Sequence, residues 1–494
     1  MKVNKVMWAV LRGSVCVHFV FFLFLSSCAT TTPSAQQIER DSQTTAATTG
    51  QPEIRTDWPN LSDLSEWERM TPGELELLLH VHDVNATDGN NATALMMAAF
   101  SNRNPEVIDL LIEAGAHVNI QHQFGNTALM FATGFAADAT IVDMLIASGA
   151  DVNLRSIDGT TALMKAAEND VDITVMDALI DAGADVNAQT SDGYTALMYA
   201  ATTNENTEKI DRLLTAGADV NLRDVNGRTA LMMVVGINRN YEISRRLITA
   251  GSDLNHRSVG NWTALMIAAQ SNVKPELIDL LIEAGADVNV EAENGADALV
   301  IAARFGASFG VIDRLIAAGA DVTKRDNSSH TALMYAATVS DDPAVITRLV
   351  QAGADLDARN EAGWNPLILS VSLNKNIHIL RSLLAAGADL HGDDGDGWTP
   401  LMFAAQFCET PAIIEELIAG GIDIHVQDRN GLNALMIAAA TNPLPDVVDL
   451  LLTAGADVHA TARDGNTAFS LIQSNPNMMD TAAYYRLRDL TLRE

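Results

Sequence analysis

The chain has 494 residues, which is long enough for several domains or for one long array. Hydrophobic residues make up 48% of it but aromatic residues only 5%, so a core would consist mainly of Ala, Leu, Ile and Met. The formal net charge of −32 repels phosphate backbones, which argues against nucleic-acid binding, and three cysteines are too few for a disulfide framework or a zinc site.

Residues 1–27 have the features of a secretion signal. Lys2, Lys5 and Arg12 precede the apolar run GSVCVHFVFFLFL (13–25), which is too short to span a bilayer comfortably. The run ends in Leu-Ser-Ser-Cys, and these small residues before Cys28 resemble a bacterial lipoprotein signal. The resemblance implies that Cys28 becomes the lipidated first residue. The alternative is an ordinary signal peptide in which Cys28 is incidental.

This resemblance implies a lipid anchor in the bacterial envelope, on the periplasmic side or at the outer surface. Ala29, which follows the cysteine in place of Asp, slightly favours the outer membrane. Residues 28–56 are rich in Thr and Ser and contain few bulky apolar residues, so they are expected to form a flexible tether.

Residues 57–88 are expected to be an N-terminal capping half-repeat. Thr71, Pro72 and Glu74 have the spacing of a helix N-cap, a first helical residue and a capping-box partner. Eleven repeats of 34 residues then occupy 89–465, and 466–494 form a C-terminal capping repeat with a charged final helix.

The repeats share the motif TALM or a variant of it, and every step between copies is 34 residues. We number the repeats 1–12 and call the first residue of each motif position 0: Thr93, Thr127, Thr161, Thr195, Thr229, Thr263, Asp297, Thr331, Asn365, Thr399, Asn433 and Thr467. Leu at position 2 and Ala at positions 5 and 6 predict a short first helix. Apolar residues at positions 14, 15, 18 and 19 predict a second helix.

Two glycines mark most repeats, with Asn91, Asn261 and Ser329 in place of the second one and no glycine at position 22 of the last repeat. Glycine at position 22, from Gly115 to Gly455, follows the second helix and predicts a left-handed C-terminal cap. Glycine at position −2, preceded by Asp or Asn in most repeats, predicts a hairpin turn. No unit can bury its apolar residues alone, so stability must come from stacking.

The pattern DGxTALMxAA…LLxAGADVN resembles the ankyrin repeat across about residues 85–475. The resemblance implies an all-α solenoid of helix-turn-helix units joined by short β-hairpin loops. Two departures stand out. The connection between the two helices is one residue longer than usual, and Met replaces the family's usual histidine at position 3, where we expect a core residue.

The resemblance also implies that position −1 lies on the hairpin finger and faces a partner. The aromatic and charged types found there dominate binding hot spots, and they include Tyr194, Trp262, His330, Trp364 and Trp398. Phe305 and Phe407 at position 8 are expected to extend this surface along the first helices. The alternative is that all these side chains pack against neighbouring fingers.

Histidines form a second column at position 26, which is position −8 of the next repeat, and Asn occupies it in six successive repeats from Asn119 to Asn289. His391, His425 and His459 follow later in this column. Equivalent positions in neighbouring units are too far apart to share one metal ion. We therefore expect Asn and His alike to brace the turn of the next unit.

No nucleotide-binding glycine loop, GxSxG or HExxH motif occurs, so we expect no catalytic activity, cofactor or metal. The predicted function is non-catalytic binding of a protein partner by a membrane-anchored, monomeric scaffold. Two alternatives stay open. One is a passive structural or protective envelope protein, and the other is a surface-displayed protein that meets a host.

Overall fold

The computed structural model describes residues 64–102, 104–134, 139–203 and 207–492, all within one unit, Thr56–Glu494. The signal sequence, Cys28, the tether and the first residues of the cap lie outside these ranges. No helix among the described residues is long and apolar enough to cross a membrane.

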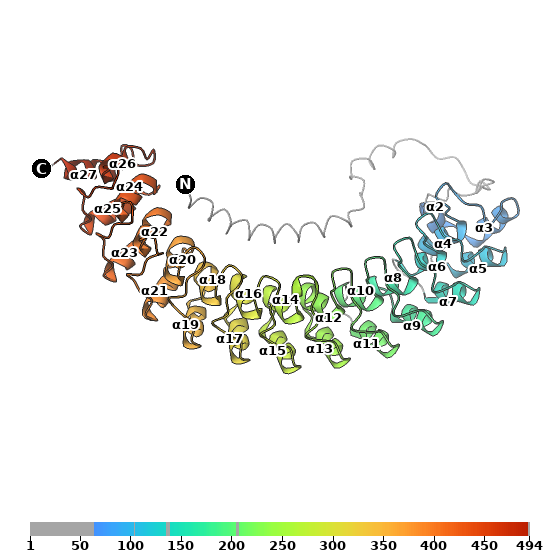
Figure 1. Ribbon diagram of the computed structural model, residues 1–494. Helices are drawn as coiled ribbons and strands as arrows, with labels where there is room; N and C mark the ends of the chain where they lie inside the picture. The colour runs from blue at the N-terminus through green and yellow to red at the C-terminus, as the bar shows by residue number, and fades with distance from the viewer. Residues whose placement is uncertain (1–63, 103, 135–138, 204–206, 493–494) are drawn as a thin grey trace, which may run out of the picture. The chain divides into compact units, whose positions relative to one another are not determined.

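Each repeat folds into two antiparallel helices, and the repeats stack in chain order as two rows (Figure 1). The first helices are α4 (Ala94–Ser101), α6 (Ala128–Ala132), α8 (Ala162–Glu168), α10 (Ala196–Thr203), α12 (Ala230–Met233), α14 (Ala264–Gln270), α16 (Ala298–Arg304), α18 (Ala332–Val339), α20 (Pro366–Leu373), α22 (Pro400–Phe407), α24 (Ala434–Thr441) and α26 (Ala468–Ile472). The π-helical turn η1 (Val234–Asn238) continues α12, and the 3-10 turn η2 (Val259–Asn261) lies in a hairpin.

The second helices form the other row. They are α5 (Pro105–Glu113), α7 (Ala139–Ala147), α9 (Ile173–Asp181), α11 (Thr207–Thr215), α13 (Tyr241–Thr249), α15 (Pro275–Glu283), α17 (Phe309–Ala317), α19 (Pro343–Gln351), α21 (Ile377–Ala385), α23 (Pro411–Ala419), α25 (Pro445–Thr453) and α27 (Ala482–Thr491). This all-α arrangement confirms the expected fold class.

The residue at position 0 starts the first helix by capping it. In repeat 3, Thr161 Oγ1 accepts a hydrogen bond of 3.3 Å from the N–H of Met164, three residues on. That bond satisfies one of the four N–H groups that have no partner inside a helix. Behind the cap, Leu163, Met164 and the pair Ala166–Ala167 are buried, so the methionine column belongs to the core as expected.

Glycine ends the second helix in the predicted way. Gly183 has a φ of 89°, its N–H donates to Ile180 O, and the N–H of Ala184 donates to Leu179 O. The left-handed backbone conformation costs glycine nothing, because it has no Cβ. The turn at position −2 has the same requirement, and where Ser329 replaces glycine there the φ is still 60°.

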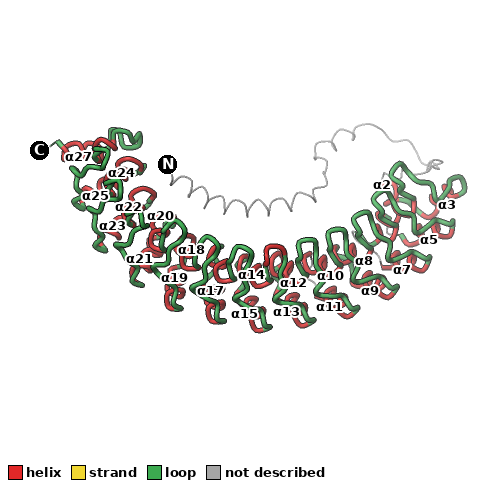
Figure 2. The backbone as a smooth tube through the Cα atoms, in the orientation of Figure 1, coloured by secondary structure: helices red, strands yellow, loops and turns green. Residues whose placement is uncertain are grey.

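The hairpins are tight turns with almost no strand character (Figure 2). In repeat 3 the N–H of Ser156 donates to Thr160 O and the N–H of Gly159 donates to Ser156 O. The β-bridges assigned within the described residues are two isolated pairs, Thr87–Thr93 and Arg325–Thr331.

Backbone bonds join the tips of neighbouring hairpins. The N–H at position −4 donates to the carbonyl at position −3 of the preceding repeat, as from Ile157 to Phe124 at 3.0 Å. Such bonds link repeats 1 to 8 without interruption and also link repeat 11 to repeat 12. Among the described residues, none crosses the boundaries 8–9, 9–10 and 10–11.

Asparagines at position −8 connect the turns of successive repeats. Asn187 Nδ2 donates to Gly217 O at 3.1 Å, and its Oδ1 accepts from the N–H of Asp219 at 2.8 Å. The same pair of bonds recurs at every asparagine of the column: Asn85, Asn119, Asn153, Asn187, Asn221, Asn255 and Asn289. We call these residues the turn asparagines.

A second set of asparagines lies in the lengthened connection between the helices. Asn442 is buried, and its Nδ2 donates to Ala405 O at 2.9 Å in the preceding repeat. Asn102 and Asn374 make equivalent bonds, each to two carbonyl groups at the end of the preceding first helix. These carbonyls have no partner inside their own helix, so the connection supplies the missing donors.

Lys209 fills the same role between repeats 3 and 4. Its ammonium group, in α11, is buried and donates to Ala166 O at 3.0 Å and to Asn169 O. Burial lowers the pKa of Lys209, because the charged form loses water and the negative charge of Asp170 offsets this loss only in part.

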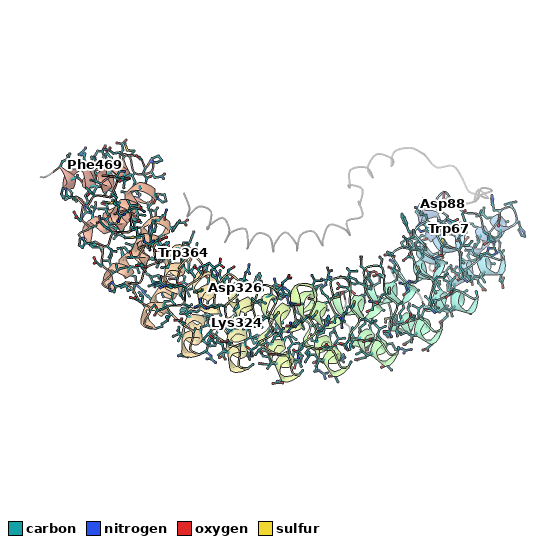
Figure 3. All side chains as sticks on the ribbon, in the orientation of Figure 1. Trp67, Asp88, Lys324, Asp326, Trp364 and Phe469 are labelled. Carbon is teal, nitrogen blue, oxygen red and sulfur yellow. The ribbon has the colours of Figure 1, made fainter. Side chains whose placement is uncertain are left out.

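Each end of the array closes differently from the interior. α2 (Leu64–Arg69) and α3 (Pro72–Leu79) form the N-terminal cap, and Thr71 and Glu74 make the predicted capping box. Trp67 of α2 is fully buried against the first repeat (Figure 3). At the other end, α27 buries Ala483 and Leu487 and exposes most of its charged residues, as expected.

Removing one turn asparagine should weaken one interface. Asn187→Ala deletes a donor and an acceptor, and we expect a loss of about 1–3 kcal/mol in the free energy of unfolding. The reverse change is His391→Asn, which rebuilds the donor and acceptor opposite Gly421 and Asp423 and should stabilise repeats 10 and 11. Urea unfolding measures both. Equal midpoints for wild type and Asn187→Ala would contradict the structural role.

Asp297 is an N-cap in an unfavourable environment. Its side chain accepts from the N–H of Val300 at 2.8 Å, but Oδ2 is buried without a hydrogen-bond partner. Burial raises the pKa of Asp297 from 3.8 to about 6. The native protein therefore holds an extra proton between these two values, and its stability falls as the pH rises through that window.

Asp297→Asn should remove this pH dependence, because Asn365 and Asn433 serve as neutral N-caps at the same position. At pH 7.5 the variant should be more stable than wild type by roughly 1–3 kcal/mol, and near pH 4 the gain should vanish. Denaturant unfolding at several pH values measures this. Thr331→Asn is the control, since it exchanges one neutral cap for another and should leave the pH profile unchanged.

Candidate partner-binding surface

The predicted column at position −1 lies on the hairpins, but its aromatic side chains turn inward. Trp364 is only 9% exposed, and its ring lies edge-on against Phe403 of the next repeat at 5.0 Å (Figure 3). Trp398 is half-buried beside the same phenylalanine at 5.3 Å, and its Nε1 donates to Asp428 at 3.1 Å. Trp262 is half-buried against the core.

The other two members of the column are also held by neighbours. The Tyr194 hydroxyl accepts from Arg228 at 3.0 Å, and its ring lies 5.4 Å from that of Tyr199. His330 stacks on Tyr335 with ring centroids 5.0 Å apart and contacts Asn360 at 3.1 Å. Burial lowers the pKa of His330, which favours the neutral imidazole.

Three of these contacts cross the boundaries that lack a tip-to-tip backbone bond. His330–Asn360 joins repeats 8 and 9, Trp364–Phe403 joins 9 and 10, and Trp398–Asp428 joins 10 and 11. The alternative for this column is that its side chains pack against neighbouring fingers, and Trp364 does so. Its burial leaves little surface for a partner, whereas Trp398 and His330 keep part of theirs.

The inward contacts depend on position 4 of the first helix, which sequence reasoning overlooked. Tyr199, Tyr335 and Phe403 occupy it in repeats 4, 8 and 10. Position 4 alternates between aromatic, aliphatic and basic residues, as position −1 does. The two positions could have been paired from the sequence by matching large residues in the same or the adjacent repeat.

The two phenylalanines predicted at position 8 are half-buried at the ends of their first helices. Phe305 lies beside the guanidinium of Arg304, whose centre is 5.9 Å from the ring centroid. Phe407 precedes Cys408, whose buried Sγ lies 3.0 Å from Thr410 O. Burial raises the pKa of the Cys408 thiol, so the residue serves as a small core side chain.

The histidine column behaves differently from the asparagines that it follows. His391 and His425 are exposed, and their imidazoles form no hydrogen bond to a described residue. Their backbone N–H groups donate to Asp389 and Asp423 at 2.9 Å. The expectation that His braces the next turn is therefore wrong for these two. The donor and acceptor nitrogens of an imidazole point in different directions, whereas the Nδ2 and Oδ1 of a carboxamide lie side by side and can meet neighbouring backbone groups. Within the described residues, no group of three or more His, Cys, Asp or Glu is placed to hold a metal ion.

The most exposed apolar side chains of the hairpins lie at their tips. Phe124, Ile157, Val225 and Val259 are between 60% and 75% exposed, and we call them the fingertip row. They occupy positions −3 and −4 in repeats 2, 3, 5 and 6, where the backbone alone makes the inter-repeat bonds. Later repeats carry Glu, Asn, Gly or Arg at position −4.

A hollow of about 240 Å³ lies at the foot of this row, and its lining includes Phe100, Phe131 and Lys165. Phe100 and Phe131 meet edge to face at 5.8 Å. His122 bridges this pair to the fingertip, with ring distances of 5.8 Å to Phe131 and 5.2 Å to Phe124. The first three repeats thus combine an aromatic recess with a projecting aromatic ring.

The fingertip row could have been found in the sequence. Position −4 lies in a polar turn, and three β-branched residues there have no helix to stabilise and no core to join. The sequence prediction instead placed the binding surface at position −1, where the tryptophans occur, and that position faces the first helix.

Truncating Trp364 should destabilise the protein, whereas truncating a residue of the fingertip row should leave its stability almost unchanged. Trp364→Ala removes a buried ring and should destabilise the protein by about 3–5 kcal/mol. Ile157→Ser changes a side chain that is 75% exposed and should alter stability by less than about 0.5 kcal/mol. Thermal and urea unfolding compare the two. A neutral Trp364→Ala would show that the ring is dispensable for stacking.

The comparisons with known proteins agree with this geometry. The family model for ankyrin repeats (3 copies) matches overlapping segments that together cover residues 72–462. No curated protein matches the chain. The repeat length, the paired helices, the hairpins and the family match lead to one conclusion: the chain belongs to the ankyrin repeat family.

Proposed function

We propose that this protein is a non-catalytic scaffold that binds a protein partner through its hairpin tips and first-helix row, while a lipid on Cys28 anchors it to the bacterial envelope. Ankyrin repeats are generally protein–protein interaction modules, which supports the scaffold role. Partner identity cannot come from the fold, because repeat folds host many partners.

The observation that carries the proposal is the fingertip row. Folding leaves these apolar residues in water although polar residues occupy the same position in other repeats. Exposed apolar side chains gathered on one side of a soluble protein mark interaction sites, and four of the five tips in repeats 2–6 are apolar, with Ser191 of repeat 4 as the exception. The passive structural alternative gives no reason for apolar tips confined to repeats 2–6, beside an aromatic recess.

The net charge of −32 bears on the choice of partner. Such a field repels anionic surfaces and acidic proteins at long range and is screened within about 8–10 Å at physiological salt. A partner therefore makes its main contacts through apolar surface at short range. Display toward a host protein at the outer surface fits the same geometry and remains the alternative.

Loss of the three β-branched residues of the fingertip row should reduce partner recovery. Native membranes are crosslinked and the protein is captured as wild type or as Ile157→Ser, Val225→Ser and Val259→Ser combined. We expect partner recovery to fall at least tenfold with the combined variant, while its unfolding midpoint stays unchanged. The control is Tyr241→Ser, which removes an exposed apolar residue from the second helix of repeat 5. Equal recovery by all three proteins would refute a role for the fingertips.

The lipid anchor has its own test. Cys28→Ala should move the protein from the membrane fraction, which detergent solubilises, to the aqueous fraction. It should also abolish incorporation of radiolabelled palmitate, because the acyl chains would have no attachment site. Cys16→Ala, which lies inside the apolar run, is the matched control and should change neither result. Retention of Cys28→Ala in the membrane would place the anchor elsewhere.

A further inference from the structure

The guanidinium of Arg304 is half-buried and makes no hydrogen bond or ion pair with any residue that the structure describes. It ends α16, in the first-helix row, and its central carbon lies 5.6 Å from the ring centroid of Tyr335 and 5.9 Å from that of Phe305. Arginines of the second-helix row differ, since Arg314 and Arg348 pair with carboxylates of the preceding repeat.

The ring beneath Arg304 is fixed by its own repeat. The hydroxyl of Tyr335 donates to Asp326 at 2.6 Å, and His330 stacks on the Tyr335 ring at an interplanar angle of 25°. Asp326 is buried, and its other oxygen accepts from the N–H groups of Ser328 and His330 at 3.0 and 2.9 Å. The hairpin therefore holds the tyrosine, and the tyrosine supports the guanidinium.

Apolar side chains follow Arg304 in the chain and in the next repeat. Phe305 is the next residue, and Val339 of α18, which lies beside Gly306, is 43% exposed. We call Arg304, Phe305, Tyr335 and Val339 the Arg304 platform. It presents a planar cation whose N–H groups donate to none of the described residues and whose orientation is already restricted by two rings.

We propose that the Arg304 platform binds a single carboxylate flanked by an apolar side chain on a protein partner. Covering the guanidinium without acceptors would leave a desolvated charge unpaired, whereas a carboxylate accepts two parallel N–H bonds. The apolar neighbour would cover Phe305 and Val339. An acidic tract is disfavoured, because the array carries a net charge of −32.

This inference rests on the proposed function and names the chemistry that one part of the surface recognises. The carboxylate has two sources, a peptide C-terminus or an Asp or Glu side chain. Both present the same pair of oxygens to the guanidinium. The partner would meet the platform on repeats 7 and 8, beyond the fingertip row.

The test selects ligands directly. A library of random peptides with free C-termini is screened against the full chain, and enriched sequences are synthesised in three forms: unchanged, C-terminally amidated, and with Asp and Glu replaced by Asn and Gln. We expect enriched peptides to need one of the two carboxylates. Fluorescence anisotropy then compares wild type with Arg304→Gln, which should bind at least about tenfold more weakly.

Two further variants isolate the geometry. Arg304→Lys keeps the charge but loses the planar pair of donors, so it should recover only part of the affinity. Arg314→Gln removes a second-helix arginine and should bind as wild type does. The unfolding midpoint of Arg304→Gln should lie close to that of wild type, because only the contacts with the Phe305 and Tyr335 rings are lost and no hydrogen bond or ion pair to a described residue.

The outcomes separate this inference from the proposed function. Peptides that bind without a carboxylate, or that bind Arg304→Gln as well as wild type, overturn the platform. Failure to enrich any peptide overturns it too. In each case the fingertip experiment on native membranes still decides whether the protein is a binding scaffold.

Discussion

Every feature of this protein depends on the stacking of one first helix on the next. The alanine pairs, such as Ala166–Ala167, are fully buried at these contacts and let the helices approach closely. A single unit of two short helices has no interior of its own, so each interface supplies the core for both of its neighbours. The capping helices at either end are amphipathic for the same reason: each has one neighbour only.

Stacking also buries polar groups at the helix ends, and side chains of the next repeat supply their hydrogen-bond partners. Short helices end often, and each end leaves carbonyl groups without partners. The connector residues Asn102, Asn374 and Asn442 satisfy these groups, and buried Lys209 does the same with a charge. The turn asparagines add a second set of directional bonds. These polar residues are therefore explained by the hydrogen bonds that they make to a neighbouring repeat, and not by a role inside their own repeat.

The fold could be predicted almost completely from the sequence, because an exact period of 34 carries the same local signals many times over. Helix limits, glycine caps and the methionine core follow from short-range patterns that any one repeat displays. The surface could not be predicted as well. Whether Trp364 points to solvent depends on Phe403, 39 residues away in the next repeat. Comparing only the residues at position −1 does not reveal this pairing. The exposure of Ile157 was not predicted, because it results from how few side chains pack around the hairpin tip.

Among the described residues, interfaces 8–9, 9–10 and 10–11 lack both the turn-asparagine bridge and the tip-to-tip backbone bond. Their hairpins are joined by side chains instead: Arg325 donates to Arg359 O, Arg359 donates to Asp393 O, and Arg429 donates to Asp396. A bond between two backbone groups forms whatever side chain occupies the position, whereas a bond from an arginine is lost when that arginine is replaced. The tips of repeats 1–8 can therefore change their side chains without losing this connection, but those of repeats 8–11 cannot.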